Sequence, residues 1–109
     1  MERLFDTNIL TDYLNGISQA RNELTLYPDK FISIVTSMEI LVGTDLAEQS
    51  AVDHFLLWFS ISPLDTHVSI KAVALRKLTR LKLPDAVIWY AAQSHKLLLI
   101  TRNSKVFSP

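Results

Sequence analysis

The sequence predicts an α/β domain with a mostly parallel central sheet of about four strands. Short apolar runs recur along the chain, and each is followed by residues with helical spacing or helix caps. Strands that alternate with helices in this way are typical of parallel sheets with right-handed crossovers. The 109 residues are enough for one domain, residues 1–109, and 49% hydrophobic with 20% charged residues supports a packed core.

In the first part of the chain we expect two strands with helices between them. Residues 3–5 form the first strand, and the helix that follows stops at Gly16 because glycine suits the position just after a helix. Residues 18–27 form a second helix with Ser18 as its N-cap. Residues 31–35 are mostly apolar and β-branched, so they predict the second strand.

The middle of the chain is helical. Thr36 and Glu39 have the spacing of a capping box at the start of a short helix that ends at Gly43. Residues 45–60 form another helix, and residues 55–59 within it are apolar on every side. Such a helix is either sandwiched or covered by another chain.

In the last part we expect two strands with a helical pair between them. Residues 61–64 form a short strand at the edge of the sheet, because Pro63 is tolerated there. Helices over residues 67–81 and 86–96 precede the last strand, residues 97–101.

Composition excludes several kinds of site. The chain has no cysteine, which rules out disulfides, zinc thiolates and thiol nucleophiles and fits a reducing cytoplasm. The three histidines are scattered, and two glycines are too few for a phosphate-binding loop. No apolar run approaches the roughly 20 residues of a membrane span, and no signal peptide begins the chain. We therefore expect a cytoplasmic protein without a membrane partner.

The net charge of zero hides an asymmetry between the two parts of the chain. Residues 1–65 hold ten acids and three Lys or Arg, a balance of −7, whereas residues 66–109 hold one acid and eight Lys or Arg, a balance of +7. The basic part favours affinity for a polyanion, or else the two parts attract one another.

Three carboxylates share one position in the expected architecture. Asp6 ends the first strand, Glu39 begins the helix after the second, and Asp85 begins the helix before the last. Because parallel strands end at the same edge of a sheet, we expect Asp6 and Glu39 to be neighbours there. Asp85 reaches the same edge if the segment before it crosses back over the sheet, which the helices over residues 67–81 and 86–96 permit. Clustered oxygen ligands suit Mg²⁺ or Mn²⁺, which support phosphodiester hydrolysis. The alternative is that each acid only caps a helix.

The sequence resembles the PIN-domain ribonucleases, in particular VapC-type toxins of type II toxin–antitoxin pairs. Four blocks carry the likeness in the family's order: Phe5-Asp6-Thr7-Asn8-Ile9-Leu10 with Asp12-Tyr13-Leu14, Ile34-Val35-Thr36-Ser37-Met38-Glu39-Ile40 with Gly43, Arg80-Leu81-Lys82-Leu83-Pro84-Asp85-Ala86 with Ala91-Ala92, and Leu99-Ile100-Thr101-Arg102-Asn103-Ser104-Lys105 with Phe107. Each block alone is a weak signal, but the set is specific.

The resemblance implies a three-layer α/β/α sandwich and a Mg²⁺- or Mn²⁺-dependent endoribonuclease. By position it implies metal-binding roles for Asp6, Glu39 and Asp85, with Asn103 as a further catalytic residue. The polar residues that match the family's pocket are Thr7, Asn8, Thr36 and Thr101. The resemblance also implies an RNA substrate, a homodimer, and a cognate antitoxin that inserts into the active-site groove.

Four basic residues are candidates for contacts to RNA phosphates: Arg76, Arg80, Lys82 and Arg102.

The chain departs from the family pattern in two places. Val106 stands where relatives commonly carry another acid, and the chain stops at Pro109, before a further strand of those relatives. This departure leaves open a catalytically weakened module that binds RNA or protein. A third reading is a purely structural α/β domain.

Overall fold

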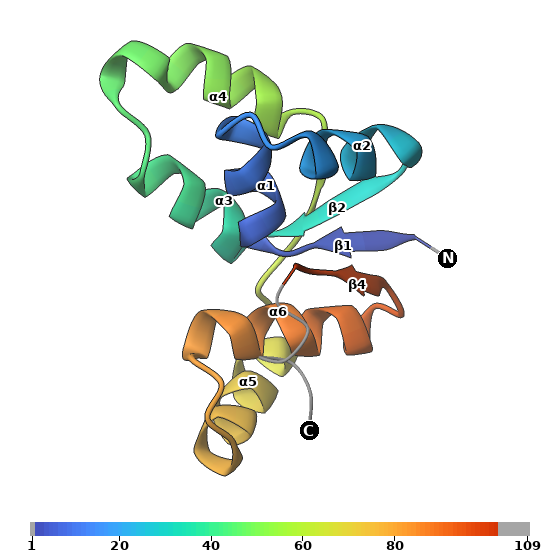
Figure 1. The fold of residues 1–109 in the computed structure, drawn as a ribbon. Helices are drawn as coiled ribbons and strands as arrows, with labels where there is room; N and C mark the ends of the chain where they lie inside the picture. The colour runs from blue at the N-terminus through green and yellow to red at the C-terminus, as the bar shows by residue number, and fades with distance from the viewer. Residues whose placement is uncertain (1, 103–109) are drawn as a thin grey trace.

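Four short strands form one parallel sheet in the computed structural model, which describes residues 2–102 (Figure 1). The strands are β1 (Arg3–Phe5), β2 (Lys30–Ser33), β3 (Ser60–Ser62) and β4 (Leu98–Ile100), in the order β3-β2-β1-β4. Strand β1 is central, because Leu4 pairs with Phe31 of β2 on one side and with Leu99 of β4 on the other. The predicted parallel sheet is confirmed, with β3 at its edge.

Helices cover both faces of the sheet. Their bounds are α1 Thr7–Leu14, α2 Ser18–Leu26, α3 Ile34–Val42, α4 Gln49–Leu56, α5 Thr66–Leu78 and α6 Leu83–Ser94, with a 3₁₀ turn η1 at Leu46–Glu48. Figure 1 shows α1, α2 and α4 above the sheet and α5 and α6 below it. This is the expected three-layer α/β/α arrangement. Within residues 2–102, no helix has both the length and the apolar character needed to cross a membrane.

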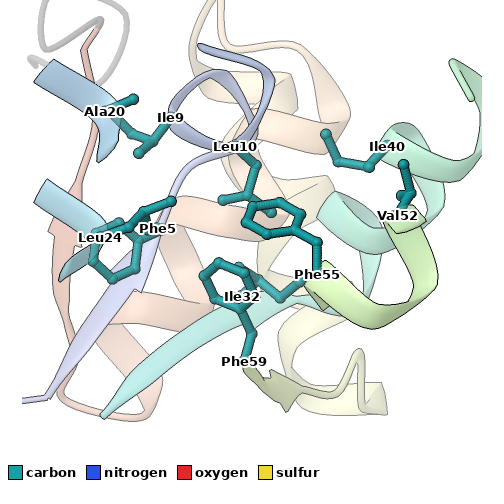
Figure 2. Packing of buried hydrophobic residues seen from close by; sticks show 10 residues of the cluster. All are labelled: Phe5, Ile9, Leu10, Ala20, Leu24, Ile32, Ile40, Val52, Phe55 and Phe59. Carbon is teal, nitrogen blue, oxygen red and sulfur yellow. The ribbon is translucent and has the colours of Figure 1, made fainter. Parts of the chain in front are cut away.

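Each face of the sheet has its own hydrophobic core. Strand β1 contributes to both, since Phe5 and Leu4 are fully buried and point to opposite faces. Figure 2 shows the upper core, which consists of Phe5, Ile9, Leu10, Ala20, Leu24, Ile32, Ile40, Val52, Phe55 and Phe59. The lower core packs Leu4 against the helical pair α5 and α6. The two cores fix the position of β1, and therefore also the position of Asp6, which follows it directly.

Helix α3 begins earlier than the sequence predicts. Ser33 is the N-cap, and its hydroxyl accepts a hydrogen bond from the backbone N–H of Val35 at 3.1 Å. The predicted capping box at Thr36 is therefore wrong, since Thr36 lies inside the helix and is fully buried. β-Branched side chains favoured a strand up to residue 35. In the structure α3 packs against α1 and α6, and this tertiary packing outweighs the local preference.

Several other element boundaries differ from the prediction. Ser18 lies inside α2, whose N-cap is Ile17, without a side-chain cap. In place of the expected helix over residues 45–60, the structure has η1 followed by α4. Helix α4 ends at Leu56 because the chain turns at 57–59 to enter β3. Helix α6 starts at Leu83, since proline is well suited to the first helical turn.

The apolar segment at residues 55–59 is only partly covered. Phe55 and Phe59 are buried against the upper core, whereas Trp58 and Leu57 are 51% and 80% exposed. The rings of Tyr13 and Phe55 are stacked, with centroids 4.7 Å apart, and Trp58 packs edge-on against both. The segment at residues 55–59 is thus neither fully buried between other elements nor fully exposed.

Candidate functional site

The carboxyl ends of the strands and the starts of three helices meet at one end of the sheet. In Figure 1, α1 and α3 begin at the left end of the sheet, and α6 begins below that end. Asp6 follows β1 directly, and its backbone N–H donates to the carbonyl of Ile100 in β4 at 2.9 Å. The geometry expected for an α/β sheet therefore places three polar segments together here.

Asp6 is the buried acid of this site, with only 4% of its surface exposed. One carboxylate oxygen, Oδ1, accepts a hydrogen bond from the backbone N–H of Thr7 at 2.8 Å, so Asp6 does cap α1. The other oxygen, Oδ2, accepts one from the hydroxyl of Thr101 at 2.7 Å. Capping therefore accounts for one oxygen, and the second is oriented by a residue from the opposite end of the chain.

Glu39 joins the site through a hydroxyl relay. Its Oε1 accepts a hydrogen bond from the hydroxyl of Thr7 at 2.9 Å, and that hydroxyl lies 2.9 Å from the hydroxyl of Thr36. A hydroxyl has one proton to donate, so Thr36 is the donor to Thr7 when Thr7 donates to Glu39. Glu39 lies in the second turn of α3, where its carboxylate does not cap the start of the helix, which removes the capping explanation for this acid.

Asp85 lies in the first turn of α6 and is half-buried. Burial raises the pKa of its carboxyl above the ordinary value of 3.8, the carboxylates of Asp6 and Glu39 raise it further, and Lys82 lowers it. The favourable end of a helix dipole would stabilise the ionised form. Desolvation and the charges of Asp6 and Glu39 nevertheless raise the pKa of Asp85, so both acids act on this carboxyl.

Asn8 links α1 to the chain after β4. Its Oδ1 accepts a hydrogen bond from the backbone N–H of Arg102 at 3.3 Å, and its Nδ2 donates to the hydroxyl of Thr101 at 3.5 Å. All four polar residues that the sequence assigns to the pocket thus lie around Asp6 and Glu39. Asn103 lies outside the described residues, as does Val106.

The expected basic residues lie in different surroundings. Lys82 is close enough to Asp85 to affect its pKa, and Arg80 is exposed in the same connection between α5 and α6. Arg76 donates to the carbonyl of Thr79 at 3.5 Å in the last part of α5. Arg102 is engaged within the molecule, because its Nε donates to Oδ2 of Asp12 at 2.8 Å.

Asp12 belongs to the first of the four sequence blocks, but the sequence assigns it no role. Its side chain is only 17% exposed and binds Arg102. The partner lies 90 residues further along the chain, so no local pattern reports the contact. Its place on the same helix as Asn8 is the one sequence signal, since residues four apart share a helix face.

The donor set fits a hard divalent cation. The functional atoms around Asp6 are carboxylate and hydroxyl oxygens, which Mg²⁺ and Mn²⁺ prefer. Asp6 and Glu39 raise the pKa of Asp85, and a bound cation would offset their negative charge. Within residues 2–102, no group of three or more His, Cys, Asp or Glu side chains is arranged so that it could hold a metal ion.

Comparison with known proteins agrees with this architecture. A family model described as the PIN domain matches residues 3–108. A solved structure described as a toxin–antitoxin complex from Klebsiella pneumoniae matches with 41% sequence identity and a TM-score of 0.89, over 98% of this chain and 91% of that chain. A comparison with curated proteins found no match.

Proposed function

Because this chain belongs to the PIN-domain family, we propose that it is a Mg²⁺- or Mn²⁺-dependent endoribonuclease that acts as the toxin of a toxin–antitoxin pair, of VapC type. The observation that carries the proposal is that Asp6, Glu39 and Asp85 lie near the carboxyl end of the sheet, where Asp6 and Glu39 raise the pKa of Asp85. Such a raised pKa is typical of a site that binds a cation in its working state.

The residues around Asp6 support this function by their orientation. Thr101 and the Thr7 backbone fix both oxygens of Asp6, and Thr7 fixes one oxygen of Glu39. Groups that are held before the substrate arrives need no reorganisation during the reaction. We infer that Asp6 and Asp85 hold the cation, with Glu39 in support and Asn103 as a further polar group.

A divalent ion held by Asp6 and Asp85 would neutralise charge on a phosphate and would make water easier to deprotonate. The chain's own contribution is to exclude bulk water around Asp6, which is buried, and to hold the carboxylates of Asp6 and Glu39 in fixed directions by hydrogen bonds. Lys82 at the rim supplies positive charge next to Asp85. Arg80 and Arg76 extend this basic surface toward the end of α5, where an RNA backbone would be held by salt-dependent contacts.

The match to a toxin–antitoxin complex supports a protein partner for this chain. We propose a cognate antitoxin that covers the site, and a homodimer, in a cytoplasmic setting where RNA is available. Trp58 and Leu57 offer an exposed apolar surface for one of these partners. A weakened PIN module that binds without cleaving is the second candidate, favoured by Val106 in place of an acid.

Cleavage of a structured RNA, with Mg²⁺, with Mn²⁺ and with EDTA, tests the function. We expect cleavage that requires the metal and falls at least about 100-fold in Asp6→Asn. Asp53→Asn is the matched control, because Asp53 is an exposed acid on α4 whose side chain contacts Gln49. Binding without cleavage, unchanged by Asp6→Asn, would support the binding module instead.

A further inference from the structure

We propose that Asp12 and Arg102 are a positioning pair that orients the Asp6 carboxylate through Thr101. The inference rests on the proposed function, and it assigns a role to Asp12, which had none, and to Arg102 a role other than the expected phosphate contact. It begins with one ion pair, in which Arg102 Nε donates to Asp12 Oδ2 at 2.8 Å.

The pair lies between two segments that are far apart in the sequence. Asp12 is on α1, and Arg102 follows the end of β4. Asn8, one helical turn before Asp12, accepts a hydrogen bond from the backbone N–H of Arg102 at 3.3 Å. Helix α1 therefore holds residue 102 at two points, by its backbone and by its side chain.

The next residue toward β4 is the one that contacts the acid. Thr101 donates its hydroxyl to Oδ2 of Asp6 at 2.7 Å and lies 3.5 Å from Nδ2 of Asn8. The direction of the Thr101 hydroxyl depends on the path of the backbone at residues 101 and 102. That path is fixed by contacts to Asn8 and Asp12, so the Asp12–Arg102 ion pair acts on Asp6 through Thr101.

The exposure of the two side chains favours orientation over stability as the role of the pair. The Arg102 side chain is 63% exposed and that of Asp12 is 17% exposed. An ion pair with one partner in water contributes little to folding. Residues that orient a metal ligand, by contrast, typically change metal affinity or activity by about 10–100-fold. Because Asp12 neutralises Arg102, this arginine is also less available to a phosphate than Arg80.

The test measures metal affinity and steady-state kinetics separately. Asp12→Asn, Arg102→Gln and the double variant are compared with the wild type for Mn²⁺ affinity without RNA, for kcat and KM on RNA, and for thermal unfolding. We expect each single variant to weaken Mn²⁺ binding and lower kcat about 10-fold, with KM changed less than about twofold. The double variant should be no worse than either single variant, because one interaction is removed.

Two controls separate this role from others. Asp53→Asn should leave Mn²⁺ affinity and kcat unchanged, whereas Arg80→Gln should raise KM and leave Mn²⁺ affinity unchanged. Arg102→Lys, which keeps the charge, should recover most of the Mn²⁺ affinity, and it carries the test if Arg102→Gln does not fold.

The proposal is overturned if Arg102→Gln raises KM and lowers the salt dependence of RNA binding while Asp12→Asn has no effect, since Arg102 is then a phosphate contact. Unchanged Mn²⁺ affinity in both variants also overturns it. If the wild type binds Mn²⁺ but cleaves no RNA, the proposed function fails, and the Mn²⁺ affinities of the variants still decide the positioning role.

Discussion

The hydroxyl of Thr7 donates a hydrogen bond to Oε1 of Glu39 at 2.9 Å, across 32 positions of the chain. The contact joins the first turn of α1 to the second turn of α3, and the buried hydroxyl of Thr36 completes it. Glu39 is otherwise exposed, so this hydrogen bond is what directs its carboxylate toward Asp6 and Asp85.

Thr7→Val tests this relay. The variant keeps the shape of the side chain but removes the donor to Glu39 and the partner of Thr36. Because the Thr36 hydroxyl is buried, we expect a loss of about 1–3 kcal/mol in unfolding free energy. Without its orienting donor, Glu39 should support a cation less well, with Mn²⁺ affinity reduced about 10-fold. Chemical denaturation and calorimetric titration measure the two effects, and Thr7→Ser, which retains the hydroxyl, should stay close to the wild type in both.

Asp85→Asn should stabilise the metal-free protein at neutral pH. The pKa of Asp85 is raised in the folded state by burial and by Asp6 and Glu39, so the carboxyl binds its proton more tightly when folded. Stability therefore falls as the pH rises from about 3.8 through the raised value, and the full cost remains at pH 7. Thermal unfolding should show a higher Tm for Asp85→Asn at pH 7, with the difference shrinking as the pH falls toward 3.8.

With Mn²⁺ added, the wild type should have a higher Tm than Asp85→Asn, the opposite of the result without metal. Ligand binding to the folded state stabilises by about 2.7 kcal/mol at 100 times the Kd, so the wild type should gain Tm while Asp85→Asn gains little. Asp53→Asn should follow the wild type at every pH and metal concentration. A lower Tm for metal-free Asp85→Asn at pH 7 would show that Asp85 acts as a stabilising cap.

Arg80→Gln should weaken RNA binding mainly through the loss of a backbone contact. For single-stranded RNA, each neutralised phosphate contributes about 0.7 to the slope of log affinity against log salt. We expect that slope to fall by about this amount, with kcat nearly unchanged. Fluorescence anisotropy at several salt concentrations measures it, and Lys71→Gln on α5 is a control that the sequence does not place among the RNA contacts. An unchanged slope would remove Arg80 from the RNA-binding surface.

Lys96→Gly should stabilise the fold without affecting the site. Lys96 follows the end of α6 with φ of 55°, the left-handed region where a Cβ is strained. The backbone N–H of Leu97 closes this turn by donating to the carbonyl of Ala92 at 2.9 Å. Glycine suits this position, so we expect a gain of about 1 kcal/mol. Lys96→Ala retains the Cβ and should give no comparable gain, and urea unfolding compares the three proteins.

Local sequence patterns were sufficient to identify the elements themselves. Residues 3–5 form a strand because two fully buried side chains alternate across the sheet, and Gly16 ends α1 with a φ of 80° that glycine tolerates. Boundaries were less predictable. Ser33 rather than Thr36 caps α3, because both residues have suitable hydroxyls and only packing decides which one the helix uses.

For the site, the sequence by itself determined that Asp6 ends a strand and that Glu39 and Asp85 lie in helices that adjoin strands, and from this we expected the three acids to share an edge of a parallel sheet. Topology dictates that much, because parallel strands all end on one side. Only the tertiary structure decided what holds those acids. Thr101 on Asp6, Thr7 on Glu39 and Asp12 on Arg102 are contacts between residues 32 to 95 positions apart. Such contacts depend on side-chain direction and burial after the layers have packed, and no local periodicity encodes them.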